Sequence, residues 1–515
     1  HEVVTCVDRD HWMIAIQDEL RSLRDCGVYK IILLTNVPPP AKPIPSKWVF
    51  KVKGDGNGCV TRFKARMVAC GYRQKFGRDF DRTYAPVAHA ASIRLLLRLA
   101  ACFKLKVRQF DIKTAFLYGV LPEHQRVYLL PPQGLDVPAG CVLDLHLAVY
   151  GLRQAPLCFN EHLNGTLEHY HFVRSTHDPC VYFKHAADSV IVILAVVVDD
   201  ILLVSNSQEA ADTFAVNMKR VYKMTDLGVP SRMVGININI ADNGVITIDQ
   251  NLFIRDLAEK FGQSACNPIR NPVAAGEVPE GASPQLPPDH NNLSLVGSLL
   301  WITISRPDVA VAVSLECSHS VSPTVADKAA AIRILCYLFH AQDVCITYKP
   351  HDTSTTPVSV YVDSAWANEP KSRSRFGNCV HVYGEPVLWK TKVSTMVCLS
   401  TAEAEFVAAV EAGKASQWIS NMLHEILGSQ PAPILILEDN QACIRMASNP
   451  VVSSHNRHFA MRMWWLRHQI ELGVITMTHL PSVRQLADIF TKVLPTPRFR
   501  ALHTALMLGD HSMLE

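Results

Sequence analysis

Two adjacent aspartates interrupt the most apolar stretch of this chain. Asp199 and Asp200 stand between two β-branched runs, 189–198 and 201–204, and each run has the texture of a strand. Burying two like charges side by side is costly, and each raises the pKa of the other unless a divalent cation lies between them. The pattern therefore predicts a hairpin with a metal site at its turn. A solvated two-residue turn is the alternative, because aspartate favours turns.

Length and composition allow several domains and large cores. The chain has 515 residues, of which 48% are hydrophobic, and this length suggests three or four domains of roughly 150 residues. Its 15 cysteines never form a Cys-x-x-Cys pair, which favours reduced thiols in an intracellular protein over a disulfide or zinc framework. No apolar run reaches about 18 residues, so we expect no membrane span. The chain begins with His1, and we expect it to be a piece of a larger product.

Positive charge is concentrated near the N-terminus. The segment 47–82 holds ten lysines and arginines against three aspartates, whereas the whole chain has a net charge of only +3. A local positive field of this kind suits a polyanion such as a nucleic acid. A solvated basic face is the alternative interpretation.

Hydrophobic spacing predicts the following elements. Helices are expected at 10–26, 91–102 and 161–170, and a hairpin with a glycine-rich turn is expected from 48–53 and 59–64. A short strand at 107–110 should end at Asp111. The expected domains are a first region at 1–270, a linker or domain edge at 271–292, a helical region at 293–357, an α/β domain at 358–492 that begins with a strand at 358–362, and a weak helix or tail at 493–515.

One strand that ends in an aspartate and a strand pair that carries two more form the layout of a palm-type polymerase site. In such sites two cations bridge carboxylates and phosphates. One lowers the pKa of the attacking hydroxyl group, and the other holds the triphosphate and stabilises the leaving pyrophosphate. Asp111 and the Asp199-Asp200 pair are the candidates for these carboxylates.

A series of motifs follows in a fixed order along the chain. They include Lys-Trp-Val-Phe-Lys, Phe-Lys-Ala-Arg-Met-Val-Ala, Thr-Tyr-Ala-Pro-Val, Gln-Phe-Asp-Ile-Lys-Thr-Ala-Phe-Leu, Tyr-Gly-Leu-Arg-Gln-Ala-Pro and Val-Val-Asp-Asp, at 47–51, 63–69, 83–87, 109–117, 150–156 and 197–200. Shorter matches lie at 226–228, 234–236, 294–300 and 305–308. In this order the chain resembles the reverse transcriptase and RNase H region of copia-type LTR retrotransposon polyproteins.

The resemblance implies roles for individual residues of the first site. Asp111, Asp199 and Asp200 would bind two Mg²⁺ or Mn²⁺ ions. By the same resemblance the nucleotide would be held by Lys64, Arg66, Phe116 and Gln154, with Phe116 as the ring that excludes a ribose 2′-hydroxyl. On packing statistics alone, Phe116 would be an ordinary core aromatic. The primer end would lie near Val197, Met233 and Gly235.

A second acidic set lies in the C-terminal α/β region. Asp363 and Asp439 each follow strand-like residues, a layout that can bind two cations and activate water against a phosphodiester, although solvated surface acids are the common alternative. The resemblance to RNase H motifs implies that this second site also holds two Mg²⁺ or Mn²⁺ ions, with the ligands Asp363, Glu405, Asp439 and Asp488. Glu403 is the fallback for Glu405. We do not expect both to bind the same ions, because helix neighbours two apart do not share a face. His458 is given a substrate-contact or structural role.

Four positions depart from the family pattern. Val197 replaces an aromatic residue before Val-Asp-Asp, and Ala365 replaces the second aspartate of the first RNase H motif. The tryptophan expected after Gln-Ala-Pro appears as Phe159, at a displaced position. Ala460 replaces an acidic residue after the histidine element. Loss of the ring at Val197 should loosen primer positioning. All seven candidate carboxylates are present.

The expected fold is an α+β palm, fingers and thumb polymerase followed by an α/β RNase H-like domain with a mixed sheet. The expected function is RNA-directed DNA polymerisation with cleavage of the RNA of RNA–DNA hybrids. Expected partners are an RNA template, a DNA or tRNA primer, dNTPs, a second copy in a homodimer and the other polyprotein products, integrase, protease and capsid. Virus-like particles in the cytoplasm are the expected location, and the nucleus is a second one. A catalytically inactive nucleic-acid-binding relic and a structural subunit for an active partner are the alternatives.

Overall fold

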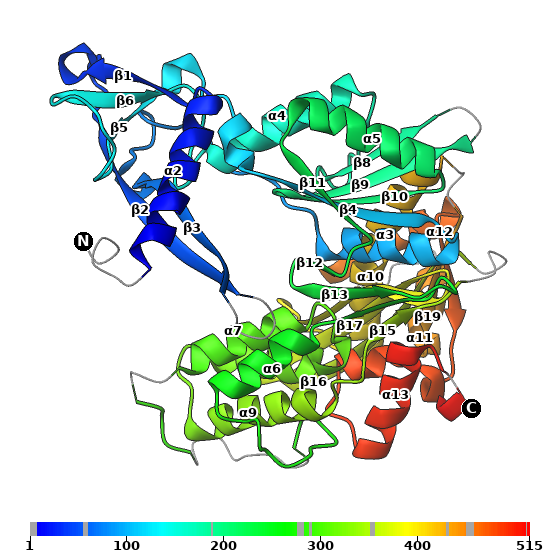
Figure 1. Ribbon diagram of the computed structural model, residues 1–515. Coiled ribbons are helices and arrows are strands. Elements are labelled where there is room, and N and C mark those ends of the chain that lie inside the picture. The colour runs from blue at the N-terminus through cyan, green and yellow to red at the C-terminus, as the bar shows by residue number, and fades with distance from the viewer. Residues whose placement is uncertain are drawn as a thin grey trace.

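The computed structural model describes residues 8–54, 60–186, 189–274, 283–287, 291–350, 356–428, 432–449, 458–510 and 512–514. It is a mixed α+β structure with four sheets (Figure 1). The predicted glycine-rich turn at 55–59 and much of the predicted linker at 271–292 lie outside the described residues. Among the described residues, every helix is too short or too polar to span a bilayer.

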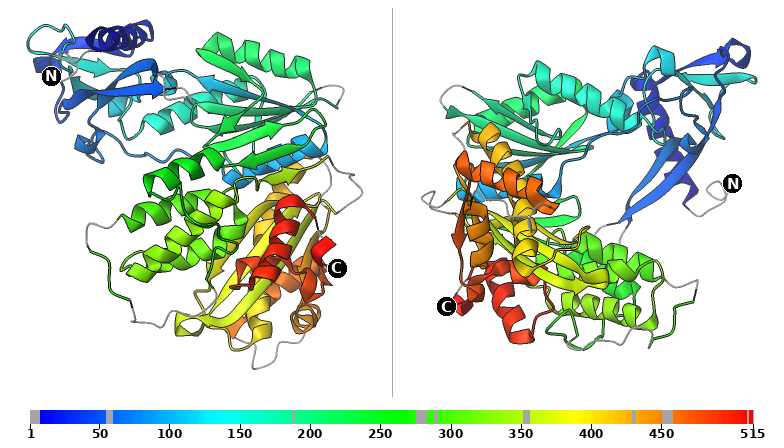
Figure 2. Two further views of the ribbon diagram at one scale, coloured as in Figure 1. Left: turned by 60° about the horizontal axis from the view of Figure 1, so that its bottom comes forward. Right: turned by 180° about the vertical axis from the view of Figure 1, so that it is seen from behind.

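The N-terminal sheet projects from the rest of the molecule (Figures 1 and 2). Its strand order is β1-β6-β5-β2-β3, and α2 packs on β3. The predicted hairpin is confirmed as β2 and β3, paired antiparallel. The apolar face of α2 is buried, as its helical spacing predicts. The elements are α2 (Arg9–Asp25), β1 (Tyr29–Leu33), β2 (Ile44–Gly54), β3 (Val60–Ala69), β5 (Val127–Leu130) and β6 (Cys141–Leu145).

A six-stranded sheet in the order β11-β4-β10-β9-β8-β7 forms the second layer. Ile201 and Leu203 of β10 belong to the core under α4 and α5, while Leu202 and Val204 belong to the core under α3. This alternation follows from the period of two in a strand, and it explains why β9 and residues 201–204 of β10 are apolar. The elements are α3 (Ala90–Cys102), β4 (Lys106–Ile112), α4 (Ala155–His169), β7 (Val173–Arg174), β8 (Val181–His185), β9 (Ile191–Val197), β10 (Asp200–Ser205), α5 (Gln208–Val221) and β11 (Met224–Gly228).

A small sheet and four helices follow. The helical region predicted at 293–357 contains a strand near its end, β15, which pairs with β14 and closes the sheet β12-β13-β14-β15. The residues of β15 have helical apolar texture, but their pairing with a distant strand decides their conformation. The elements are β12 (Arg232–Met233), β13 (Ile236–Ile240), β14 (Ile246–Asp249), α6 (Asn251–Lys260), α7 (Asn292–Ile302), α8 (Ala310–His319), α9 (Val325–His340) and β15 (Ile346–Tyr348).

The C-terminal sheet has the order β18-β17-β16-β19-β20. The pairs among β16, β17 and β18 are antiparallel, and β19 is parallel to both β16 and β20. The sheet is therefore mixed, as predicted. The segment interpreted as a weak helix or tail forms α13, whose Phe499 and Leu502 are buried in the core. The elements are β16 (Val358–Glu369), β17 (Arg373–Val382), β18 (Glu385–Val393), α10 (Thr401–Leu427), β19 (Ile434–Glu438), α11 (Gln441–Ser448), α12 (Ala460–Glu471), β20 (Ile475–His479) and α13 (Thr496–Leu508).

Helix α3 joins the six-stranded sheet to the C-terminal sheet. It lies between the two in Figure 1, and it contacts both β10 and β18. Arg94 donates to the carbonyl of Val387 at 2.7 Å and lies 3.7 Å from the ring centroid of Trp389. Arg98 donates to the carbonyl of Val382 at 2.9 Å and to two more carbonyls at 2.6 Å. Burial lowers the pKa of both guanidinium groups.

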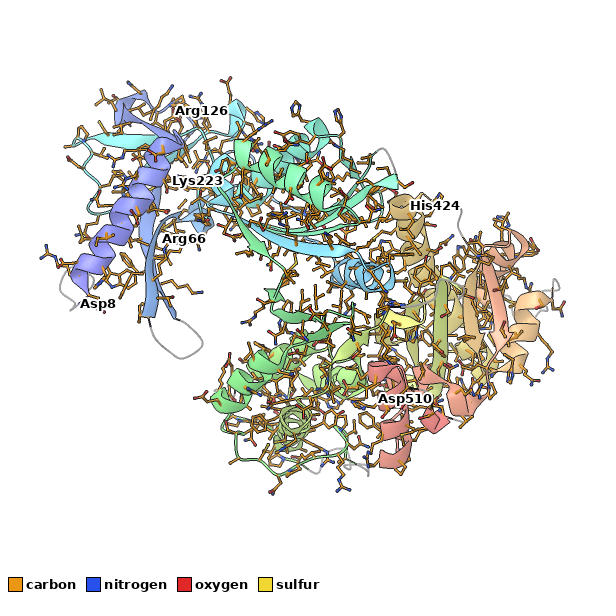
Figure 3. All side chains as sticks on the ribbon, turned by 45° about the vertical axis from the view of Figure 1, so that its right-hand side comes forward. Asp8, Arg66, Arg126, Lys223, His424 and Asp510 are labelled. Atoms are coloured by element: carbon orange, nitrogen blue, oxygen red, sulfur yellow. The ribbon has the colours of Figure 1, made fainter. Side chains whose placement is uncertain are left out.

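A second contact joins the same two regions at the far end of α10, near His424 in Figure 3. Ser175 Oγ donates to a carboxylate oxygen of Glu425 at 2.6 Å. Trp418 Nε1 donates to the carbonyl of His177 at 2.9 Å. The two regions are thus held at two separated points, and one core continues through both.

A buried ion pair stabilises the helical region. Arg306 and Asp308 are 1% and 2% exposed, and their side chains form two hydrogen bonds of 2.9 and 2.7 Å. Tyr337 also donates to Asp308, at 2.7 Å. Burial alone would raise the pKa of Asp308, but the adjacent guanidinium lowers it to about 2. The ion pair therefore contributes its full stability at pH values above 3.8, the ordinary pKa of an aspartate. This contribution to the free energy of unfolding is lost as the pH falls through about 2.

We expect Asp308→Ala to lower the free energy of unfolding by about 3–5 kcal/mol at neutral pH, because it leaves the buried Arg306 guanidinium without a counter-charge. Urea denaturation monitored by circular dichroism measures the change. Asp256→Ala, on the exposed face of α6, is the control and should change stability by less than about 0.5 kcal/mol. An Asp308→Ala protein as stable as this control would contradict the prediction.

Two candidate metal centres

The hairpin of β9 and β10 presents the aspartate pair at its turn. Val197 pairs with Asp200, so Val198 and Asp199 form a two-residue turn. Val198 has a φ of 56°, a left-handed conformation that is strained for a β-branched residue. The predicted hairpin is therefore confirmed, and its backbone strain lies next to the carboxylates.

Asp111 lies directly opposite this pair. In the antiparallel pairing of β10 with β4, Asp200 is the register partner of Asp111. The Ile112 amide donates to the carbonyl of Asp199 at 2.9 Å and ties the turn to β4. Asp200 also accepts a hydrogen bond of 3.3 Å from Gln109 Nε2. The three predicted carboxylates thus lie at one end of the six-stranded sheet, and we call them the first carboxylate site; among the described residues, their oxygens do not form a group within 4.8 Å.

The negative charges of the three aspartates at this site repel one another. Burial raises the pKa of Asp199, the charge of Asp111 raises it further, and Arg66 and Lys64 lower it. Burial also raises the pKa of Asp200, as do Asp199 and Asp111, while Gln109 lowers it. A divalent cation would relieve this repulsion and keep the carboxylates ionised. Three half-buried carboxylates that face this mutual repulsion fit that role.

A cavity of about 410 Å³ opens in front of the first carboxylate site. Asp111 and Asp199 line it from the six-stranded sheet, and Lys64 and Arg66 line it from β3. Figure 3 shows Arg66 and Lys223 where the N-terminal sheet meets the six-stranded sheet. Residues that line the cavity and were not predicted as site residues include Glu19, Arg62, Tyr150 and Lys223.

Tyr150 is the principal residue that sequence reasoning missed. Arg66 lies 4.3 Å from its ring centroid, and the ring itself lines the cavity. Phe116, predicted to exclude the 2′-hydroxyl, packs behind it with the ring centroids 5.0 Å apart. Gln154 is 1% exposed and donates to the carbonyl of Asp79 at 2.9 Å. Neither Phe116 nor Gln154 is among the residues that line the cavity.

The residues predicted near the primer end have different surroundings. Val197 is half-buried at the end of β9. Met233 is 1% exposed and belongs to the main core. Gly235 has a φ of 72°, and a Cβ there would lie 3.4 Å from Trp301 Nε1. Trp301 therefore packs against the turn between β12 and β13, and it is 37% exposed.

A second carboxylate site lies in the C-terminal sheet. Asp363, Glu405 and Asp439 each offer an oxygen, and the three oxygens lie within 4.8 Å of one another. Asp363 belongs to β16, and Asp439 follows β19 directly. Ser400 Oγ accepts a hydrogen bond from the amide of Glu403 at 3.2 Å and so begins α10, which carries Glu405 in its second turn. This spacing fits a divalent cation with carboxylate ligands.

The second site is more deeply buried than the first. Burial raises the pKa of Glu405 well above its ordinary value, and Glu438, Asp363 and Asp439 raise it further. Glu438 was not predicted as a site residue. It is fully buried, and burial is the main cause that raises its pKa to about 8. This many buried carboxyl groups, with Lys492 as a cation 3.0 Å from Asp363, favour a metal cation at the site.

Asp488 lies beside this group and is neutralised by two cations. Lys492 Nζ is 2.5 Å from one of its oxygens, and Arg498 Nη2 is 2.8 Å from the other. Lys492 Nζ also lies 3.0 Å from Asp363 Oδ1. Among the described residues, the three-carboxylate group does not include Asp488, and the Lys492 ammonium lies between Asp488 and Asp363.

Glu403, the fallback for Glu405, has its own partner. Its oxygens accept hydrogen bonds from His458 Nε2 at 2.7 Å and from the amide of Leu399 at 2.9 Å. Glu403 is outside the three-carboxylate group. The His458 contact is compatible with the structural alternative predicted for this histidine.

Comparison with known proteins identifies the family of this chain. Residues 29–275 match the family model described as reverse transcriptase (RNA-dependent DNA polymerase). The chain is 31% identical over 307 residues to a transposon Ty5-1 protein of Saccharomyces cerevisiae, and this match covers 98% of the yeast protein. The chain belongs to the Pol polyproteins of copia-type retrotransposons.

Plant members of this family match over most of the chain. The retrovirus-related Pol polyprotein from transposon TNT 1-94 of Nicotiana tabacum is 30% identical over 99% of this chain. That from transposon RE1 of Arabidopsis thaliana is 30% identical over 90% of it. This copia-type Pol chain spans 39% and 32% of the lengths of those two polyproteins.

The solved structure of an RNase H1 that was isolated from compost by a metagenomic approach aligns with 27% of this chain and with 94% of the RNase H1 chain. The identity is 13% and the TM-score is 0.22.

Proposed function

We propose that this chain is an RNA-directed DNA polymerase with ribonuclease H activity. The observation that carries the proposal is the first carboxylate site, where Asp111 pairs with Asp200 next to the turn that holds Asp199, at a cavity that Lys64 and Arg66 also line. The second carboxylate site supplies the nuclease. In this proposal the N-terminal sheet corresponds to the fingers, the six-stranded sheet to the palm and the region of α7 to α9 to the thumb.

Each residue of the first site has a defined task. Two Mg²⁺ or Mn²⁺ ions, when bound, stabilise the attacking and leaving oxygens of the displacement. Asp111, Asp199 and Asp200 hold these ions. Arg66 binds the triphosphate as a planar fork and Lys64 binds it as a point charge. The cavity admits a dNTP beside the primer end.

At the second site, Asp363, Glu405 and Asp439 hold the cations that activate water against the RNA strand of a hybrid. Glu438 stays buried next to Asp439, and a bound cation would favour its ionised form. Asp488 adds a further carboxylate beside these three residues. Lys492 lies between Asp488 and Asp363 and neutralises part of their negative charge.

The proposed partners follow from these reactions and from the family. They are an RNA template, a DNA or tRNA primer, dNTPs and RNA–DNA hybrids. In the family context the chain would act with integrase, protease and capsid products in cytoplasmic virus-like particles, with the nucleus as a second location and a homodimer as its assembly.

Primer extension on an RNA template tests the polymerase half of the proposal. We expect extension with Mg²⁺ and dNTPs, and its loss when EDTA removes the metal. Degradation of labelled RNA in a hybrid tests the nuclease half under the same two conditions. Absence of both reactions with Mg²⁺ and with Mn²⁺, in a folded protein, would reject the proposal.

We expect Val197→Tyr to tighten primer–template binding by about two- to tenfold, because an aromatic ring adds about 0.5–1.5 kcal/mol of contact. The dissociation rate of a labelled primer–template measures this gain. Ile191→Tyr, at the other end of β9 and on the same strand face, is the control and should leave the rate unchanged. Equal effects of the two substitutions would show that Val197 has no special position at the primer end.

A nucleic-acid-binding protein without catalysis is the second candidate. Val197 and Ala365, which depart from the family motifs, favour it. Hybrid binding that weakens steeply with salt, without extension or cleavage under either metal, would support this candidate over the enzyme.

A further inference from the structure

A groove separates α8 from the turn that joins β16 and β17. Its cavity is about 480 Å³, and α8 forms one wall while the ends of the two strands form the other. The lining is rich in positive charge, with three permanent cations against the one carboxylate of Glu369. The charged and polar residues that matter for the argument are Glu369, Lys371, Arg373, Arg375 and Thr491.

Arg375 forms the floor of this groove and is 1% exposed. Its Nε donates to Glu369 at 2.7 Å, and its Nη1 donates to Ser314 Oγ at 2.8 Å and Thr391 Oγ1 at 3.1 Å. Its Nη2 has no hydrogen-bond partner within the described part of the chain. A buried charged donor without a partner is costly, and an anion bound nearby lowers that cost through its charge.

The turn holds two more cations at the mouth of the groove. Lys371 and Ser372 have φ values of 62° and 53°, which are left-handed conformations that cost energy in residues other than glycine. This backbone displays the exposed Lys371 and the half-buried Arg373 beside Arg375. A fixed turn with several cations and few competing acids is suited to phosphate recognition.

The groove adjoins the second carboxylate site. Thr491 lines the groove, and its hydroxyl donates to Asp363 Oδ2. Lys492, the next residue, lies 3.0 Å from Asp363 Oδ1. Thr491 therefore lies between the groove and Asp363, so an anion that contacts Thr491 would lie close to the nuclease carboxylates.

We propose that this groove binds a phosphate of the nucleic-acid backbone, next to the phosphodiester that the second site cleaves. Lys371 and Arg373 bind the phosphate oxygens from the mouth, and the buried Arg375 adds positive charge beneath them. The groove then sets the register of the hybrid on the nuclease. This inference rests on the proposed function, because its ligand is the substrate of that reaction.

Methylphosphonate scanning tests the contact. In a set of RNA–DNA hybrids, one phosphate at a time is replaced by an uncharged methylphosphonate, and binding to the full chain is measured with Ca²⁺ in place of Mg²⁺. We expect the wild-type protein to lose affinity at a position near the cleaved bond. The Lys371→Ala/Arg373→Ala protein should bind the unmodified hybrid more weakly and be insensitive to the change at that position. Its slope of log Kd against log salt should differ from the wild-type slope by roughly one to two.

Lys219→Ala/Arg220→Ala provides the matched control. It removes the same charge from the exposed end of α5, which is not part of the groove lining. This protein should keep the wild-type sensitivity at every position. Thermal melting shows whether each double variant is folded.

Three other outcomes would overturn the inference or its foundation. Equal losses for the groove variant and the wild type at every phosphate would remove the groove from the hybrid path. Stabilisation of the wild type over the groove variant by inorganic phosphate, without any coupled position, would assign the groove to free phosphate and overturn the backbone contact. A wild-type protein that binds no hybrid would reject the proposed function itself.

Discussion

Asp199→Asn is expected to abolish primer extension while RNA cleavage continues. The substitution keeps the size of the side chain and removes a negative charge from the first carboxylate site, where Asp111 and Asp200 are its neighbours. A bound cation is worth several kcal/mol of transition-state stabilisation, so the loss should be about a hundred- to a thousandfold. Single-nucleotide extension of a labelled primer on an RNA template measures it.

The matched control is Asp242→Asn, which makes the same change on an exposed turn between β13 and β14. It should extend primers at the wild-type rate. Wild-type extension by the Asp199→Asn protein would reject the assignment of the first site. Hybrid cleavage in the same preparation reports whether the protein is folded.

Asp439→Asn is the reciprocal prediction. Asp439 is one of three carboxylates whose oxygens lie within 4.8 Å, and the loss of one ligand should lower the cleavage of hybrid RNA by about a hundred- to a thousandfold. Primer extension should stay at the wild-type level, because the first site has its own carboxylates. Release of labelled RNA fragments from a hybrid provides the measurement.

Glu471→Gln is the control for this change, because Glu471 is exposed at the end of α12. It should leave both reactions unchanged. An Asp439→Asn protein that still degrades hybrid RNA would reject the nuclease site. If the variant lost both reactions but melted at the wild-type temperature, the two sites could not be independent.

Local patterns were sufficient for the elements that carry the carboxylates. The two β-branched runs predicted the hairpin around Asp199 and Asp200, because a buried strand needs apolar residues on both faces. The same reasoning predicted α3 as a buried helix. The strand at 346–348 was missed, because its partner β14 lies about a hundred residues earlier in the sequence and short apolar runs do not distinguish strand from helix.

Side-chain direction was less accessible from sequence. Asp111 and Asp200 become partners through the register of β4 with β10, which no local pattern specifies. Tyr150 lines the cavity in front of Phe116, although both lie in recognised motifs. Gln154 faces Asp79 instead of the cavity, and Asp488 is paired with Lys492 and Arg498. Tertiary packing decides all of these arrangements.

The arginines of α3 have a consequence for how far apart the two reactions occur. Arg94 and Arg98 place buried charges on carbonyls of the C-terminal sheet, and separating the two regions would leave those charges unpaired. The nuclease therefore cannot swing freely relative to the polymerase. On the proposed function, the distance between the two sites is fixed for a hybrid that occupies both. The RNA is then cut at a constant number of base pairs behind the growing DNA end.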